Sequence, residues 1–184
     1  MGSAHCRATT MHTALIAVVP EAEPVVAPLR LRYDPSTRLG VPAHVTVLFP
    51  FAPRDTLSRE HLDALTAVLA AVEPFAFELR TIARFPATVY LEPGPAAPFA
   101  ALTAAIARRF PEHPPYGGRF PTVIPHLTVA DLQPENVDRA ERELAAALAA
   151  HGPIRAHCRE IALIEEADDG RWRPRASLAL RRTP

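Results

Sequence analysis

The spacing of apolar and polar residues changes several times along this chain, and each change predicts a new element. Short apolar or alternating runs, typical of strands, cover residues 14–19, 43–49, 75–85, 88–92, 124–130, 154–165 and 172–180. Apolar residues three or four positions apart predict helices over residues 57–72, 98–110 and 135–150. Pro134 begins one helix, and Pro74 and Gly152 follow the ends of two, as helix boundaries favour. Residues 21–35, with their spaced prolines, have no clear assignment.

The order of the expected elements repeats along the chain. A strand, a helix and two further strands follow one another in residues 43–92 and again in residues 124–180, where the last two strands form a hairpin around Asp168, Asp169 and Gly170. A helix and the loop 111–119 separate the two copies. This self-similarity predicts a duplicated α+β unit, in which residues 11–184 form a single domain. Residues 1–10 fit no element, and we expect a disordered segment or an extension there.

Each copy begins with the same short pattern of a histidine, an apolar residue, a threonine and another apolar residue. Residues 44–47 read His-Val-Thr-Val and residues 126–129 read His-Leu-Thr-Val. Side chains alternate between the two faces of a strand, so His44 shares a face with Thr46, and His126 shares a face with Thr128. Two copies on two apolar strands are much harder to attribute to chance than one, and they indicate one active site built by both strands.

Paired histidines and threonines suit chemistry on a phosphodiester. In-line cleavage needs a base that deprotonates the attacking water and an acid that protonates the leaving oxygen. Histidine can do either near neutral pH because its unperturbed pKa is about 6.5. Threonine hydroxyls can donate to the non-bridging oxygens as negative charge develops. The pseudo-symmetry leaves open which histidine is the base and which is the acid.

Composition narrows the class of protein. The chain of 184 residues is 48% apolar and has a formal net charge of zero. Proteins that bind long nucleic acids usually have strongly basic surfaces. Because this chain has no net charge, the expected ligand is a small nucleotide or a strand end. No apolar run approaches the roughly 18 residues of a membrane-spanning helix, and no signal peptide is evident, so we expect a cytoplasmic protein without a membrane partner. Abundant Ala, Arg and Pro indicate a high-GC bacterial source.

Other enzyme classes lack their motifs here. The chain has no glycine-rich phosphate loop and no nucleophile elbow, which disfavours nucleotide-binding P-loop or Rossmann enzymes and serine hydrolases. Two cysteines exclude a disulfide scaffold and a multi-thiolate zinc site. The remaining histidines fall on expected helix surfaces, loops or termini without metal-ligand spacing, so we treat them as structural or exposed and expect no metal and no cofactor: His5, His12, His61, His113, His151 and His157.

The paired motifs make the chain resemble the 2H phosphoesterase superfamily, specifically its bacterial 2'-5' RNA ligase-like branch of RNA 2',3'-cyclic phosphodiesterases. The resemblance extends over most of residues 12–180 and includes the phrases VLFPF, TVYLEP and PPYGGRFP. It implies two pseudo-symmetric α+β lobes around a central cleft with both motifs on its floor. It also implies metal-independent hydrolysis of 2',3'-cyclic phosphates or related phosphodiesters in RNA processing. His44 and His126 then form the acid–base pair, and Thr46 and Thr128 are the phosphate-binding hydroxyls.

One departure from the family affects the expected phosphate site. Some members place an arginine shortly after the second motif, whereas Ala130 and Asp131 follow it here. The phosphate-neutralising cation must therefore come from elsewhere, and the substrate of relatives does not transfer directly. We expect a monomer that binds a nucleotide or an RNA end with a cyclic phosphate. The alternatives are a non-catalytic module for RNA ends or nucleotides, 2'-5' RNA ligation as the reverse reaction, and hydrolysis of a cyclic oligonucleotide signal.

Substrate-binding candidates come from two further patterns. The last expected strand alternates Arg173 and Arg175 with apolar residues, and if its polar face and that of Tyr90 line the cleft, they can hold a phosphate and stack on a base or ribose. The alternative for the arginines is a solvated outer face. The glycine-containing loop before the second motif contains Tyr116 and Arg119, which suit nucleotide contact, although a rigid surface turn is equally compatible with this composition.

Overall fold

The computed structural model describes residues 11–131 and 136–181. Its strands form two four-stranded antiparallel sheets. In spatial order, the first sheet contains β2 (His44–Leu48), β1 (Thr13–Val18), β7 (Glu160–Glu166) and β8 (Trp172–Ala179). The second contains β5 (Leu127–Asp131), β4 (Thr88–Gly94), β3 (Phe75–Phe85) and β6 (Ile154–Cys158). The two motif strands, β2 and β5, are edge strands of their sheets and contact each other.

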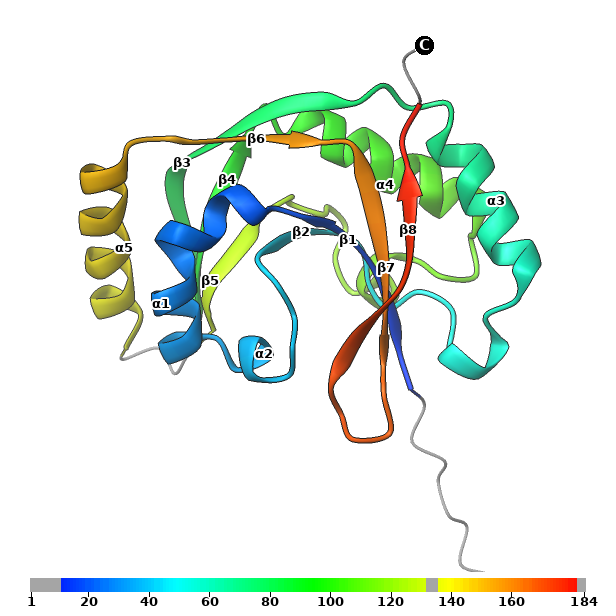
Figure 1. Cartoon of the computed structure of the whole chain (residues 1–184), viewed down its shortest axis with the longest axis horizontal. Coiled ribbons are helices and arrows are strands. Elements are labelled where there is room, and N and C mark those ends of the chain that lie inside the picture. The colour runs from blue at the N-terminus through cyan, green and yellow to red at the C-terminus, as the bar shows by residue number, and fades with distance from the viewer. Residues whose placement is uncertain (1–10, 132–135, 182–184) are drawn as a thin grey trace, which may run out of the picture.

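Helices cover the two sheets on opposite sides of the molecule (Figure 1). The α-helices are α1 (Glu23–Tyr33), α2 (Pro35–Arg38), α3 (Arg59–Leu69), α4 (Ala97–Arg109) and α5 (Val137–His151), and the short 3-10 turns are η1 (Pro20–Ala22), η2 (Arg54–Thr56) and η3 (Pro115–Gly118). Helix α4 packs on β2, whereas α1 and α5 pack on β5. None of the helices in the described ranges is long and apolar enough to cross a membrane.

The two sheets share one apolar core. Val45 and Val47 of β2, and Leu127 and Val129 of β5, are almost fully buried in the same cluster as Leu91 of the neighbouring strand. Complete burial of such a side chain stabilises the fold by about 1.5–3 kcal/mol. The apolar residues of each motif therefore anchor their strand, and the histidine and threonine are left facing the other way.

The duplication extends to irregularities of strand pairing. In the first sheet the register with the motif strand shifts between Leu15 and Ile16, and in the second it shifts between Val89 and Tyr90. After each shift the neighbouring strand places one residue opposite a motif threonine: Ile16 opposite Thr46, and Tyr90 opposite Thr128. β-bulges re-aim side chains locally, so both motif strands have the same position relative to their neighbours.

The duplicated units do not each form their own sheet. Strand β3, which follows the first motif and α3, pairs in the second sheet, and β7, which follows the second motif and α5, pairs in the first. The run expected as one strand over residues 154–165 is instead two strands, β6 and β7, that belong to different sheets. Each sheet is thus completed by strands of the other unit. β3 and β4 enter the second sheet directly after α3, whereas after α5 the chain first adds β6 to the second sheet and then crosses to the first with β7 and β8.

Most other expected elements agree with the structure to within a few residues, with two local differences. Residues 21–35, which the sequence left unassigned, contain η1 and α1. Strand β5 begins at Leu127 and not at residue 124, so His126 immediately precedes it. Residues 1–10 and 182–184, and the expected helix start at Pro134 and residue 135, lie outside the described residues.

Candidate functional site

The four motif side chains line one cavity between the sheets. Its volume is about 340 Å³, and His44, Thr46, His126 and Thr128 all contribute to its wall. Each of the four is partly accessible, whereas the residues between and after them are buried. The cavity is completed by residues from both sheets and from the segments around them: Ala14, Ile16, Asp34, Ser36, Val41, Phe49, Tyr116, Asp131, Ile164 and Trp172. The structure therefore brings together two motifs that lie far apart in the sequence.

Both histidines are held by the same backbone contact. Nδ1 of His44 lies 2.8 Å from the carbonyl oxygen of Pro42, and Nδ1 of His126 lies 2.7 Å from that of Ile124. A carbonyl oxygen only accepts hydrogen bonds, so Nδ1 must carry the proton in each imidazole. When the rings are neutral, the lone pair is therefore on Nε2. In both motifs the residue two positions before the histidine fixes this tautomer.

The environments of the two imidazoles differ on the Nε2 side. Nε2 of His44 lies 3.1 Å from Oγ1 of Thr46, so the hydroxyl can donate to it. His126 instead packs against aromatic rings, with its centroid 5.0 Å from Tyr90 and 5.3 Å from Phe85. Among the described residues, none is hydrogen-bonded to Nε2 of His126. The pseudo-symmetric halves thus provide two nonequivalent proton-transfer groups.

Burial makes both imidazoles poor proton acceptors in the free protein. It lowers the pKa of His44 to about 4, although the hydrogen bond to Pro42 opposes this change. Burial also lowers the pKa of His126, and the hydrogen bond to Ile124 opposes it. Each charged ring would lie near the other, and the charge on His126 is one further cause of the low His44 pKa. Both rings are therefore neutral near pH 7 until an anion enters the cavity.

Tyr116 lies where three cavities meet. It borders the motif cavity, a cavity of about 280 Å³ with Arg119, and an apolar cavity of about 530 Å³ with Phe85 and Phe120. Its backbone is left-handed, with φ 52° and ψ 30°, which costs about 1 kcal/mol or more in a residue with a side chain. Its amide donates to the carbonyl of Phe49 over 2.6 Å. Strain that the surrounding contacts maintain is often functional.

The Tyr116 side chain also connects to the first motif. Burial raises the pKa of its phenol, and a hydrogen bond with Thr46 opposes that effect. The phenol therefore lies near Thr46, whose Oγ1 is 3.1 Å from Nε2 of His44. Removing the hydroxyl of Tyr116 would therefore change the polarity around Thr46 without removing any direct contact of His44.

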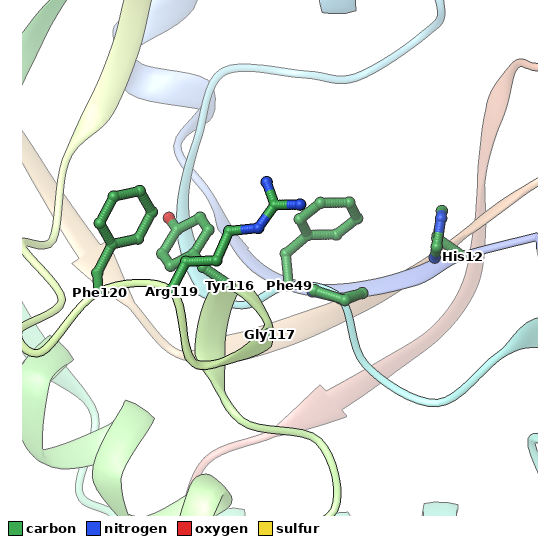
Figure 2. A pocket seen from close by; sticks show the side chains of 7 residues that line it. His12, Phe49, Tyr116, Gly117, Arg119 and Phe120 are labelled. Atoms are coloured by element: carbon green, nitrogen blue, oxygen red, sulfur yellow. The ribbon is translucent and has the colours of Figure 1, made fainter.

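Arg119 supplies a cation beside the motif cavity. Figure 2 shows its guanidinium between the rings of Tyr116 and Phe49, with Phe120 beyond Tyr116 and His12 at the opposite end. Among the described residues that line the motif cavity itself, none is an arginine. The loop expected to contact a nucleotide thus does border the site. His12, which the sequence suggested to be structural or exposed, lines this neighbouring cavity and packs edge-on against Phe49.

Arg173 and Arg175 are not brought to this site. Arg173 pairs with Asp169 over 2.8 Å and Arg175 lies 3.4 Å from Glu165, and both arginines are about half exposed or more. Strand β8 is the outer strand of the first sheet and lies away from β2, and its pairing shifts register opposite Leu163 and Ile164. The structural counterpart of Tyr90's strand is accordingly β1 and not β8, because β1 and β4 are the strands next to the motifs.

Several lining residues were not identified from the sequence. Asp34 is 5% exposed and forms a buried ion pair with Arg30, whose Nη2 lies 2.9 Å from Oδ2 of Asp34 and 3.2 Å from the carbonyl of Val41. Trp172 packs edge-on against Phe49 at a centroid distance of 5.9 Å. Neither residue belongs to a motif, and their part in the cavity depends on contacts between distant segments. For one lining residue, Phe49, the sequence did contain an indication, because the phrase VLFPF places it directly after the first motif strand.

A family model described as the 2'-5' RNA ligase superfamily matches residues 18–170. No curated protein sequence matches the chain. Among solved structures, E. coli LigT complexed with 3'-AMP has a TM-score of 0.59 at 17% identity, covering 94% of this chain and 99% of that one. E. coli LigT complexed with NADP+ has a TM-score of 0.56 at 19% identity, covering 95% and 100%. TT0787 of Thermus thermophilus has a TM-score of 0.59 at 20% identity, covering 93% and 98%. These similarities confirm the expected α+β fold.

The low pKa of His44 predicts a specific loss of stability in acid. An unfolded histidine titrates near 6.5, so between about pH 6.5 and 4 the unfolded chain binds a proton that native His44 does not. The free energy of unfolding should therefore fall as the pH decreases through this window, by at most about 3 kcal/mol from this group. Urea unfolding from pH 7.5 to 4 should show a shallower loss in His44→Gln than in the wild type.

The control for this measurement is His157→Gln, at an exposed position on β6. Its pH dependence should run parallel to that of the wild type. Parallel curves for wild type and His44→Gln would instead show that His44 is not held neutral by burial.

Proposed function

This chain belongs to the 2'-5' RNA ligase superfamily, as the paired motifs indicated, and we propose that it is a metal-independent phosphodiesterase. Its proposed substrate is a 2',3'-cyclic phosphate or a related phosphodiester of a nucleotide or RNA end. The observation that carries this proposal is the placement of both motif histidines and both motif threonines around one cavity, with the two Nδ1 atoms anchored to the backbone. Residues 11–184 would act together as one bilobal catalytic domain.

The proposed reaction uses the two histidines as base and acid. One Nε2 accepts a proton from water as the water oxygen attacks phosphorus. The other imidazole, protonated beforehand, donates its Nε2 proton to the leaving ribose oxygen, which yields a phosphomonoester and a free hydroxyl. The fixed Nδ1–H tautomers suit both roles because they direct Nε2 to the reacting groups. A bound phosphodiester anion favours the imidazolium form and offsets the low pKa of the acid.

The threonines and the neighbouring cavities fit the remaining parts of such a substrate. Thr128 would donate to a non-bridging phosphoryl oxygen, and Thr46 would turn its hydroxyl proton from Nε2 of His44 to another such oxygen when the substrate binds. The apolar cavity beside His126, with Phe85, Tyr116 and Phe120 in its wall, offers rings on which a base can stack. Tyr90 would position His126 through ring contact. Arg119 would supply the cation that the second motif lacks, facing a phosphate that extends beyond Tyr116.

Structures of E. coli LigT with 3'-AMP and with NADP+ show that this relative binds nucleotides. They support a nucleotide ligand for this chain. Joining ends by the reverse reaction would use the same groups, but water at about 55 M favours hydrolysis unless the two ends are held together. A panel of 2',3'-cyclic nucleotides, 2'-5' and 3'-5' oligonucleotides and cyclic dinucleotides, analysed by mass spectrometry, tests substrate class and ligation together.

Removing either histidine should nearly abolish turnover. We expect His44→Ala and His126→Ala each to lower kcat/KM by about 10²-fold or more, because general acid–base catalysis contributes 10²–10⁴-fold per group. The double variant should lose less than the product of the two effects, since the groups act as a unit. Thr46→Ala and Thr128→Ala should each lose less, up to about 10-fold, because each removes one neutral donor worth roughly 0.5–1.5 kcal/mol.

The matched control is His151→Ala, which removes an exposed histidine at the end of α5. It should retain wild-type turnover. Near-normal rates in either motif variant, with product binding preserved, would favour the non-catalytic binding module.

The pH dependence of kcat/KM should reflect the lowered pKa values. The base must be deprotonated, so the rate should rise through about pH 4 if His44 is the base. The acid must be protonated, so the rate should fall again through the pKa of His126, which lies below its usual range. Exchanging the roles gives the same bell-shaped profile. The profile for kcat should lie at higher pH, because the bound anion raises both pKa values; an optimum of kcat/KM well above pH 7 would contradict this assignment.

Activity should survive chelation. The described residues that line the motif cavity include two histidines and two carboxylates, but the proposed reaction assigns both imidazoles to proton transfer. Turnover measured after dialysis against EDTA should equal that of untreated protein. Loss of activity that a divalent ion restores would mean that the proposed chemistry is wrong.

A further inference from the structure

A second group of chemically active side chains lies outside the cleft. His61 is in the first turn of α3, and Glu112 and His113 lie between α4 and η3. One ligand atom from each of the three residues lies within 4.8 Å of the others. No sequence motif indicated this group, because His61 is far from the other two along the chain.

Two buried phenylalanines pack against the imidazoles. His61 stacks on Phe110 with an interplanar angle of 10° and a centroid distance of 6.0 Å. Phe51 meets both histidine rings edge-on, at 6.1 Å from His61 and 5.4 Å from His113. Phe51 and Phe110 are 2% and 3% exposed. The imidazoles are therefore seated on an apolar wall, which strengthens the interaction of a cation with its ligands.

Hydrogen bonding at the cap of α3 leaves Nε2 as the His61 atom that can face a metal. Nδ1 accepts from the backbone amide of Ser58 over 3.2 Å and lies 2.8 Å from Oγ of the same residue, so Nε2 carries the proton in the metal-free protein. A metal on Nε2 would move that proton to Nδ1, which would then donate to Oγ of Ser58 in place of accepting from the amide; such an outer-shell acceptor is typical of metal-binding histidines. Nε2 of His113 lies 3.9 Å from Oε1 of Glu112, and the His113 side chain is 19% exposed.

We propose that His61, Glu112 and His113 form a peripheral binding site for a divalent transition metal, with Zn²⁺ as the best-suited ion. Two imidazoles and a carboxylate, with a water in the fourth position, are an established zinc ligand set. At Zn–ligand distances of about 2.0–2.2 Å, tetrahedral ligand atoms lie about 3.3 Å apart. The ligand atoms now lie up to 4.8 Å apart, so the exposed Glu112 and His113 would have to move closer together when the ion binds.

Such an ion would join the start of α3 to the segment that leads into the cleft. Tyr116 follows His113 closely in the chain, and its amide is bonded to Phe49, which closely precedes Phe51. The metal would thus stabilise the loop that forms one wall of the motif cavity, while the histidines of that cavity keep their proton-transfer roles. The site does not depend on the proposed function, and it is compatible with catalysis that survives chelation.

Metal binding can be measured directly on metal-free, full-length protein without an affinity tag. Titration calorimetry with Zn²⁺ should give one equivalent per chain, and Co²⁺ should develop the visible absorption bands of a tetrahedral site. Zn²⁺ should also raise the Tm of the wild type. His113→Gln and the double variant His61→Gln/His113→Gln should lose the Co²⁺ bands and about 10-fold or more in affinity.

Controls separate this site from others. Glu112→Gln should weaken binding with little effect on folding, since Glu112 is 56% exposed. His151→Gln, and His5→Gln with Cys6→Ser, should retain the full equivalent of Zn²⁺. Unchanged binding in His113→Gln, or loss of binding in the His5 and Cys6 variant, would overturn the proposal, as would the absence of any Co²⁺ bands in the wild type. Turnover of the same metal-free proteins tests the proposed function independently.

Discussion

The alternation of side chains along the two motif strands is the constraint on which the site depends. Val45, Val47, Leu127 and Val129 are anchored in a shared core, so the residues between them must face the opposite side. A one-residue slip of either strand would bury a histidine or threonine and expose a valine or leucine. The strong apolar anchoring makes this slip unfavourable. Since β2 and β5 are edge strands in contact with each other, their polar faces meet in one cavity.

Burial of the two histidines has two opposing effects on the chemistry of the site. The same desolvation that lets electrostatic interactions act strongly lowers the pKa of both histidines, which removes the proton that an acid needs. An anion in the cavity would raise the pKa of a nearby histidine again, because its negative charge stabilises the imidazolium ion. The free site is thus organised around a neutral pair, and the proposed substrate would itself supply the charge that completes the acid. The charge of the proposed substrate would thus control the protonation of the acid histidine. Among the described residues that line the motif cavity, none is an arginine that could take over this role.

The segment between α4 and β5 connects the chemistry to its surroundings. Tyr116 has a left-handed backbone, a phenol near Thr46 and a place in the walls of three adjoining cavities. Strain at this residue is maintained because its amide is tied to Phe49. The proposed metal group at His113 lies just upstream, on the same segment. A single loop would therefore contribute contacts for a base, a phosphate and a structural ion, which is why loops on a rigid scaffold often determine specificity.

The sequence by itself determined the duplicated motifs, the face on which His44, Thr46, His126 and Thr128 lie, and most helices and strands, because side-chain periodicity is a local property of the chain. Tertiary structure alone decided that residues 154–166 divide between two sheets, that each unit completes the other's sheet, and that Arg173 and Arg175 do not line the motif cavity. It also decided the approach of His61 to His113 and the place of the pair of Asp34 and Arg30 beside the cavity. These features arise from contacts between segments far apart in the chain, and such contacts leave no periodic pattern in either segment.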